Sequence, residues 1–134
     1  MIRKTLFVLF ILLAPLSQTR AQTGTTDTTI YSKVDKAPKF AGGDKELIRF
    51  LNRNTRYPWH ARNNNIQGTV QVSFVVETDG TLTNFKIIKS VAPDLDAESI
   101  RVMHSSPKWK PGKKTGKPVR TLHQVPISFT LIPG

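Results

Sequence analysis

The sequence predicts an α+β domain in which an antiparallel β-sheet of about three strands carries two main helices packed on one face. Three patterns indicate this class: helical spacing of apolar side chains over residues 44–54, a strand–turn–strand pattern over residues 70–90, and alternation over residues 119–131. Each segment has one apolar face to bury. Helices lying on one face of a twisted sheet bury these faces together.

Two main helices and one short helix are expected. The first covers residues 44–54, with Asp44 as its cap. Its apolar stripe consists of Leu47, Ile48, Phe50 and Leu51. Residues 58–64 form a short helix with Pro in its first turn. Tyr57 and Trp59 are expected to pack at the edge of the core. The last helix lies between Pro93 and Pro107, with Asp96 as its cap. Its buried face is predicted to contain Ala97, Ile100, Met103 and His104.

A β-hairpin follows the short helix. Residues 70–76 form its first strand, and Asp79-Gly80 makes the turn into a return strand over residues 81–90. In the return strand, Phe85 and Ile87 are expected to face inward and Asn84 and Lys86 outward.

The last strand is predicted over residues 119–131. It contains Pro126, which has no N–H for the ladder and favours an edge position or a bulge. Residues 108–118, which precede it, are rich in Pro, Gly and Lys, and no regular structure is predicted there.

The first 21 residues are typical of a secretory signal peptide. Arg3 and Lys4 precede an apolar run over residues 5–16, which is shorter than the roughly 20 residues of a membrane-spanning helix. Cleavage is expected after Ala21. We therefore expect a periplasmic protein without a stable membrane anchor.

The rest of the chain divides into a flexible leader over residues 22–39 and one domain over residues 40–134. The chain has 20 Lys and Arg, 9 Asp and Glu, a net charge of +11 and no Cys. Disulfides are thereby excluded. The positive charge favours acidic or anionic partners, and export makes nucleic acid an unexpected one.

No catalytic, metal or cofactor site is predicted. His60, His104 and His123 lie far apart in the sequence and lack the spacing of metal ligands, so structural or surface roles are expected. No Ser lies in a nucleophile elbow. The glycines at 112 and 116 are too close for a phosphate-binding loop, and Pro118 stands where that loop has Ser or Thr. We expect a protein that is not an enzyme.

The order and spacing of several short motifs resemble the C-terminal domain of TonB-type energy transducers, in particular the Bacteroidetes-type versions. The resemblance covers about residues 40–131. It is carried by Tyr57-Pro58, Ala61, Ile66, Gly68, Val70, Val72, Phe74, Val76, Asp79-Gly80, Leu82, Pro107, Trp109 and Pro111-Gly112.

This resemblance implies a periplasmic α+β domain that grips N-terminal segments of TonB-dependent outer-membrane receptors by β-strand addition to its last strand. The partner-binding residues are then expected to be Arg120, Leu122, Gln124, Ser128 and Thr130. The same edge could pair with a second copy, as a homodimer. Full transducers also have a membrane helix and a long Pro-rich spacer. Without these, we expect a free-standing module that binds and does not transmit force.

A second function from a different class stays open. A lysine-rich loop could bind cell-wall or lipopolysaccharide polyanions, with Trp109 as a stacking face. Its lysines are Lys108, Lys110, Lys113, Lys114 and Lys117. The structural alternative is that Trp109 fills the junction between the sheet and the helices, in which case the loop is a solvated surface.

Overall fold

The computed structural model describes residues 27–132. The predicted signal peptide, residues 1–21, lies outside this range, as does the start of the predicted leader. In chain order, the elements are β1 (Ile30–Tyr31), α1 (Asp44–Asn54), α2 (Trp59–Asn63), β2 (Gly68–Val76), β3 (Leu82–Lys89), α3 (Pro93–His104), β4 (Gly112–Lys114) and β5 (Lys117–Phe129).

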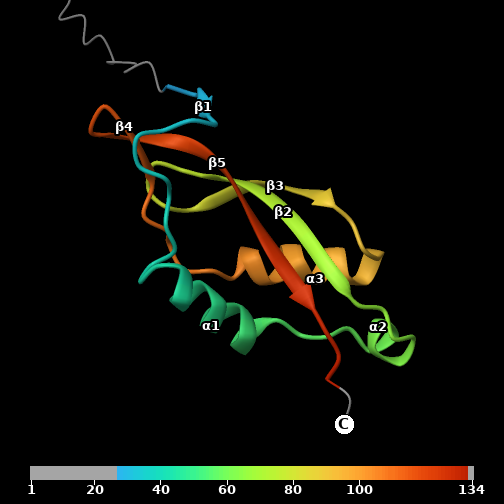
Figure 1. Cartoon of the computed structure of the whole chain (residues 1–134). Helices are drawn as coiled ribbons and strands as arrows, with labels where there is room; N and C mark the ends of the chain where they lie inside the picture. The colour runs from blue at the N-terminus through green and yellow to red at the C-terminus, as the bar shows by residue number, and fades with distance from the viewer. Residues whose placement is uncertain (1–26, 133–134) are drawn as a thin grey trace, which may run out of the picture.

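Three long strands form the body of the sheet, in the order β5-β2-β3, and both contacts of β2 are antiparallel. The pairing of β2 with β5 is continuous from Gly68 opposite Phe129 to Val76 opposite Thr121. The helices α1 and α3 lie on the same side of this sheet (Figure 1). The predicted fold class is therefore confirmed. The short strands β1 and β4, which both pair with β5, were not predicted.

Trp109 packs at the centre of the aromatic core. Its side chain is 4% exposed, and its ring centroid lies 5.3 Å from that of Phe74 and 5.6 Å from that of Phe40. The backbone N–H of Trp109 donates to the carbonyl of Gly80, at the β2–β3 turn. Trp109 therefore fills the junction between sheet and helices, and no stacking face is left for a ligand.

The helix α3 begins earlier than the sequence predicts, and its fully buried face shares only Met103 with the predicted one. Pro93 lies in its first turn, and Ala97 is exposed. The buried residues are Leu95, Glu98, Ser99, Val102 and Met103. The carboxylate of Asp96 accepts hydrogen bonds from the N–H of Val91 and the hydroxyl of Ser90, so it fastens the β3–α3 connection and does not cap the helix.

The hydrogen bonds of Glu98 explain why a charged side chain can lie on the core face of α3. Its carboxylate accepts a 2.6 Å hydrogen bond from the backbone N–H of Arg56 and two bonds from the guanidinium of Arg101. A buried carboxylate with such partners is tolerated. Periodicity of apolar residues alone could not identify this face.

Three further expectations for the helices were wrong. Gly43 precedes α1 and makes no side-chain cap, while Asp44 lies inside the first turn. Ile48, predicted within the apolar stripe, is 58% exposed, because α1 lies at the margin of the sheet and packs only along Leu47, Phe50 and Leu51. In α2, Trp59, expected to pack at the edge of the core, is 76% exposed. In β3, Asn84 and Lys86 are exposed and Phe85 and Ile87 pack on the core, as predicted.

The absence of regular structure predicted for residues 108–118 was also wrong. Strands β4 and β5 form a hairpin closed by Thr115 and Gly116, which have φ angles of 52° and 74°. Backbone pairing, which needs no apolar side chain, orders this segment. The same pairing extends into the predicted leader: Lys36 bridges to Lys113, and Lys39 bridges to Lys110. The leader boundary and its flexibility stay predictions.

We predict that Gly80→Ala destabilises the fold much more than Gly116→Ala does. Both glycines have positive φ angles, 88° and 74°. A Cβ at Gly80 would lie 2.1 Å from the carbonyl oxygen of Trp109, whereas nothing lies within 4 Å of a Cβ at Gly116. We expect a loss of at least about 3 kcal/mol for Gly80→Ala and about 1 kcal/mol for Gly116→Ala, measured by urea unfolding. Equal losses would contradict the close packing of the turn on Trp109.

Candidate functional site

Strand β5 has one edge that is largely open. Its other edge pairs with β2 along the whole of that strand. On the open side β1 pairs only with Arg120 and Thr121, in parallel. In the part of the chain that the structure describes, no strand pairs with this edge over residues 122–129. The position of Pro126 in this stretch agrees with the edge position predicted for it. Unpaired N–H and C=O groups along such an edge can accept another strand.

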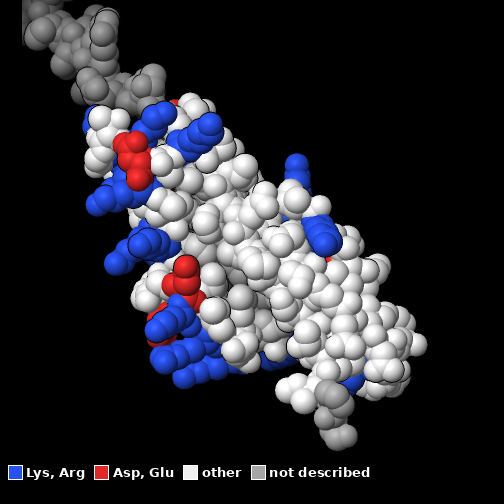
Figure 2. All heavy atoms as spheres, viewed as in Figure 1, with Lys and Arg blue, Asp and Glu red and all other residues white. Residues whose placement is uncertain are grey.

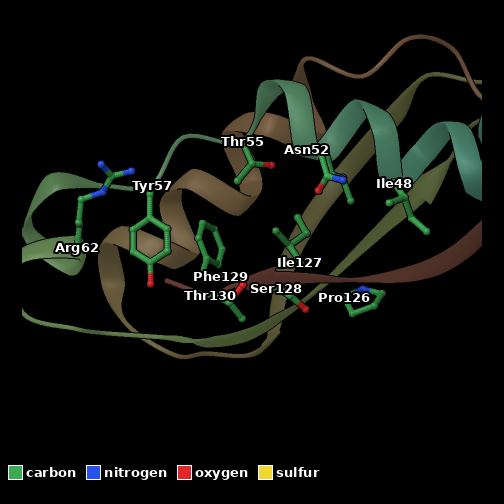
Figure 3. A pocket seen from close by; sticks show the side chains of 11 residues that line it. Ile48, Asn52, Thr55, Tyr57, Arg62, Pro126, Ile127, Ser128, Phe129 and Thr130 are labelled. Atoms are coloured by element: carbon green, nitrogen blue, oxygen red, sulfur yellow. The ribbon is translucent and has the colours of Figure 1, made fainter. Parts of the chain in front are cut away.

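A groove of about 520 Å³ lies between this edge and α1. Ile48, Leu51 and Asn52 form its helix side, and residues 126–130 form its strand side. Figure 3 shows Ile127 pointing from β5 toward the helices, while Pro126 and Ser128 lie on the opposite side of the ribbon. An extended chain in this groove would therefore meet backbone on one side and a helix on the other.

Tyr57 forms one end of the groove. Its hydroxyl donates to the carbonyl of Ile66, and its ring packs edge-on to Phe129 at 5.7 Å. The guanidinium of Arg62 lies over the ring at 5.9 Å. Burial raises the pKa of Tyr57, and the positive charge of Arg62 only partly opposes this. Tyr57 is thus a neutral, fixed wall of the groove.

The residues predicted to bind a partner fall into two groups. Leu122, Gln124 and Ser128 are exposed on the sheet face away from the helices, and Thr130 lines the groove just after β5 ends. Arg120 lies outside the open stretch because its backbone pairs with Ile30 of β1. Their roles in binding stay predictions, and for Arg120 the backbone edge is already occupied.

Arg120 holds β1 in place. Its Nε donates to Glu77 at 2.7 Å, and its Nη1 donates to the carbonyl of Thr28 at 2.8 Å. The hydrogen bond from Arg120 lowers the pKa of Glu77, although burial opposes this. The side chain therefore links β5 to the residue that follows β2 and to the residues just before β1.

The residues of α1 that line the groove were not predicted as site residues. Ile48 and Leu51 were assigned to a buried stripe, and Tyr57 to packing. Their spacing is that of any amphipathic helix, so it gives no sign that one side would stay open. Only the three-dimensional structure shows that α1 lies beside the edge of β5.

The predicted lysine loop is divided by the fold. Lys110 and Lys113 line a depression together with Lys36 and Lys39. Lys114 instead places its ammonium over the ring of Tyr31 at 4.8 Å. Lys117 pairs with Lys114 across the β4–β5 hairpin, and Lys108 lies near Asp79. Figure 2 shows Lys and Arg gathered along the margin of the molecule that carries β4 and α1.

The three histidines have packing or surface positions. The ring of His123 contacts the rings of both Phe74 and Trp109, and burial lowers its pKa. The ring of His104 packs on Phe85, and His60 lies 3.4 Å from Asp94. Among residues 27–132, no three His, Asp or Glu side chains cluster as metal ligands would. No helix in the same range has the length and apolarity to cross a membrane.

The fold and the open edge of β5 together define a small α+β domain in which backbone groups over residues 122–129 are available for pairing. Residues 53–131 match the family described as Gram-negative bacterial TonB protein C-terminal, and the chain belongs to this family. It is 32% identical over 83 residues to protein TonB from two strains of Helicobacter pylori, 26695 and J99. These alignments cover 60% of this chain but only 27% and 28% of the relatives.

A solved structure shows the same fold. The solution structure of the Helicobacter pylori TonB C-terminal domain, residues 179–285, is 23% identical and has a TM-score of 0.51. The match covers 67% of this chain and 81% of that one.

We predict that Glu77→Gln changes the acid stability of the fold. A carboxylate whose pKa is lowered in the folded state stabilises the fold at pH values above its ordinary pKa of 4.5. This stabilisation is lost as the pH falls through the lowered pKa. Glu77→Gln should therefore lower the unfolding midpoint at about pH 7, and the difference from the parent should vanish once the pH falls below the lowered pKa of Glu77.

The control is Glu46→Gln, which removes an exposed ion pair with Arg49. It should leave the midpoint almost unchanged at every pH. Thermal unfolding at several pH values measures both variants. A pH-independent difference for Glu77→Gln would contradict the role given to the carboxylate.

Proposed function

We propose that this chain is a non-catalytic protein-interaction module of TonB-dependent transport, which binds extended segments of partner proteins by β-strand addition to β5. N-terminal segments of TonB-dependent outer-membrane receptors are the partners that the family suggests. A periplasmic location follows from the predicted signal peptide and belongs to the same proposal.

One observation carries this proposal: the open edge of β5 over residues 122–129 runs beside a groove. A guest strand would lie roughly 4.8 Å from β5, with its N–H and C=O groups paired to the edge. The stretch is long enough for about eight residues, roughly 26 Å of extended chain. Main-chain hydrogen bonds of this kind give affinity with little dependence on sequence.

Selectivity would come from the two faces of the guest. Its alternate side chains would point toward the helix side of the groove, where Ile48 and Leu51 lie, or toward the open sheet face beside Leu122, Gln124 and Ser128. The residues lining the groove carry one charge, that of Arg62. Binding should therefore depend weakly on salt, because little of it is Coulombic.

The short strand β1 limits the length of the guest. It occupies the same edge of β5 at Arg120 and Thr121 and is fastened through Arg120. A guest strand can thus extend along β5 only as far as Leu122, unless it displaces β1. This favours short linear segments over long strands.

We predict that Ile48→Asp weakens the binding of a receptor peptide by about tenfold or more. The change removes apolar contact in the groove and places a carboxylate there, and losing the burial of one Ile is worth about 1.5–3 kcal/mol. Because Ile48 is 58% exposed, the fold should be unaffected. Calorimetric titration of the full chain with synthetic peptides from receptor N-terminal segments measures the effect.

Ile88→Asp is the matched control. Ile88 is 51% exposed on β3, at the far side of the sheet from β5. The Ile88→Asp variant should bind the receptor peptide as the parent does, at low and at moderate salt. Equal weakening by both variants, or no binding by the parent, would overturn the proposed site, and so would binding that disappears at moderate salt.

A further inference from the structure

Four lysines from two distant segments line one depression of about 470 Å³, which we call the lysine cradle. Lys36 and Lys39 come from the segment before α1, and Lys110 and Lys113 come from the segment that leads into β4. Within residues 27–132, Ala37 and Pro111 complete the lining. No acidic side chain is among them.

Backbone hydrogen bonds fix the lysines in opposed pairs. The N–H of Lys39 donates to the carbonyl of Lys110 at 3.0 Å, and the reverse bond is 2.7 Å long. Lys36 and Lys113 exchange the same two bonds, at 3.1 and 3.0 Å. Opposite residues in such a pair have α-carbons only about 5.5 Å apart. The backbone of each lysine therefore lies directly opposite the backbone of another lysine.

The core holds this frame rigid. Phe40 and Trp109, next in sequence to Lys39 and Lys110, are buried and pack edge to face at 5.6 Å. At the other end, Gly112 lies so close to β5 that a Cβ there would be 2.2 Å from Thr121 Oγ1. The positions of the lysine backbones are therefore set before any ligand arrives.

This arrangement is unfavourable for the protein alone. Like charges directly opposite each other on paired strands are destabilising. Among residues 27–132, none of the four lysines forms an ion pair. The nearest acidic residue in sequence, Asp35, accepts the backbone N–H of Thr115 at the hairpin tip. A multiply charged anion would remove the repulsion among all four ammonium groups.

The geometry points to a site for closely spaced phosphate groups in the lysine cradle. Lys binds phosphate as a compact point charge with three rotatable donors, without the planar geometry that the fork of Arg imposes. Four ammonium groups around one depression suit a ligand with two or more phosphates. The site is separate from the groove beside β5 and does not depend on the proposed strand addition.

The test compares two double variants of the full chain with equal loss of charge. Lys36→Gln with Lys110→Gln removes one lysine from each opposed pair, and Lys86→Gln with Lys89→Gln removes two exposed lysines of β3. The probes are tripolyphosphate in solution, measured by calorimetry, and phosphatidylglycerol vesicles, measured by co-sedimentation against phosphatidylcholine vesicles. We expect the cradle variant to lose about tenfold in affinity and the control variant less than about twofold, with binding of the parent weakened by salt.

If tripolyphosphate binds the parent and the cradle variant binds it more weakly, the site takes soluble phosphates. If only the anionic vesicles bind, and the cradle variant binds them more weakly, the site takes lipid phosphates. Equal loss in both variants, or no binding to either probe, would overturn it. Thermal unfolding gives a second readout: without anion, the cradle variant should be at least as stable as the parent, because repulsion is relieved. A less stable cradle variant would contradict the repulsion that the inference requires.

Discussion

Trp109 fills the space between the β2–β3 turn and the segment before α1, with its ring packed on those of Phe74 and Phe40. Its backbone N–H is bonded to Gly80, so the chain that leaves α3 is fixed to the hairpin turn before it enters β4. Both surfaces with a suggested function depend on this contact. It sets the register of the opposed lysines, and it places β4 so that the chain turns back into β5.

Strand β5 is constrained differently on its two sides. On one side the continuous ladder with β2 fixes its register, and alternation places Val125, Ile127 and Phe129 in the core. On the other side, β1 covers two residues and α1 stands away from the strand, leaving the groove. The stretch over residues 122–129 is open to pairing, although Pro126 within it is a residue type that limits unwanted pairing. A domain that adds partner strands needs an open edge.

The three long strands could be predicted because the apolar side chains on one face of a strand recur every two residues, as Val70, Val72 and Phe74 do. The same alternation placed Leu122, Gln124 and Ser128 on the exposed face. The short strands could not be predicted, because β1 and the pairing of Lys36 with Lys113 rest on backbone bonds between distant segments of low apolar content. The groove was missed for a similar reason: the position of α1 beside β5 decides that Ile48 stays exposed, and no local pattern encodes it.

The central claim is that β5 accepts a partner segment as an added strand, and amide hydrogen exchange tests it most directly. In a strand, only every second N–H points toward a given edge. With a saturating receptor peptide, the full chain should gain protection at alternate amides over residues 122–129, with Pro126 contributing none, and the amides that pair with β2 should keep the protection they already have. Protection confined to other elements, or no change along β5, would contradict strand addition at this edge.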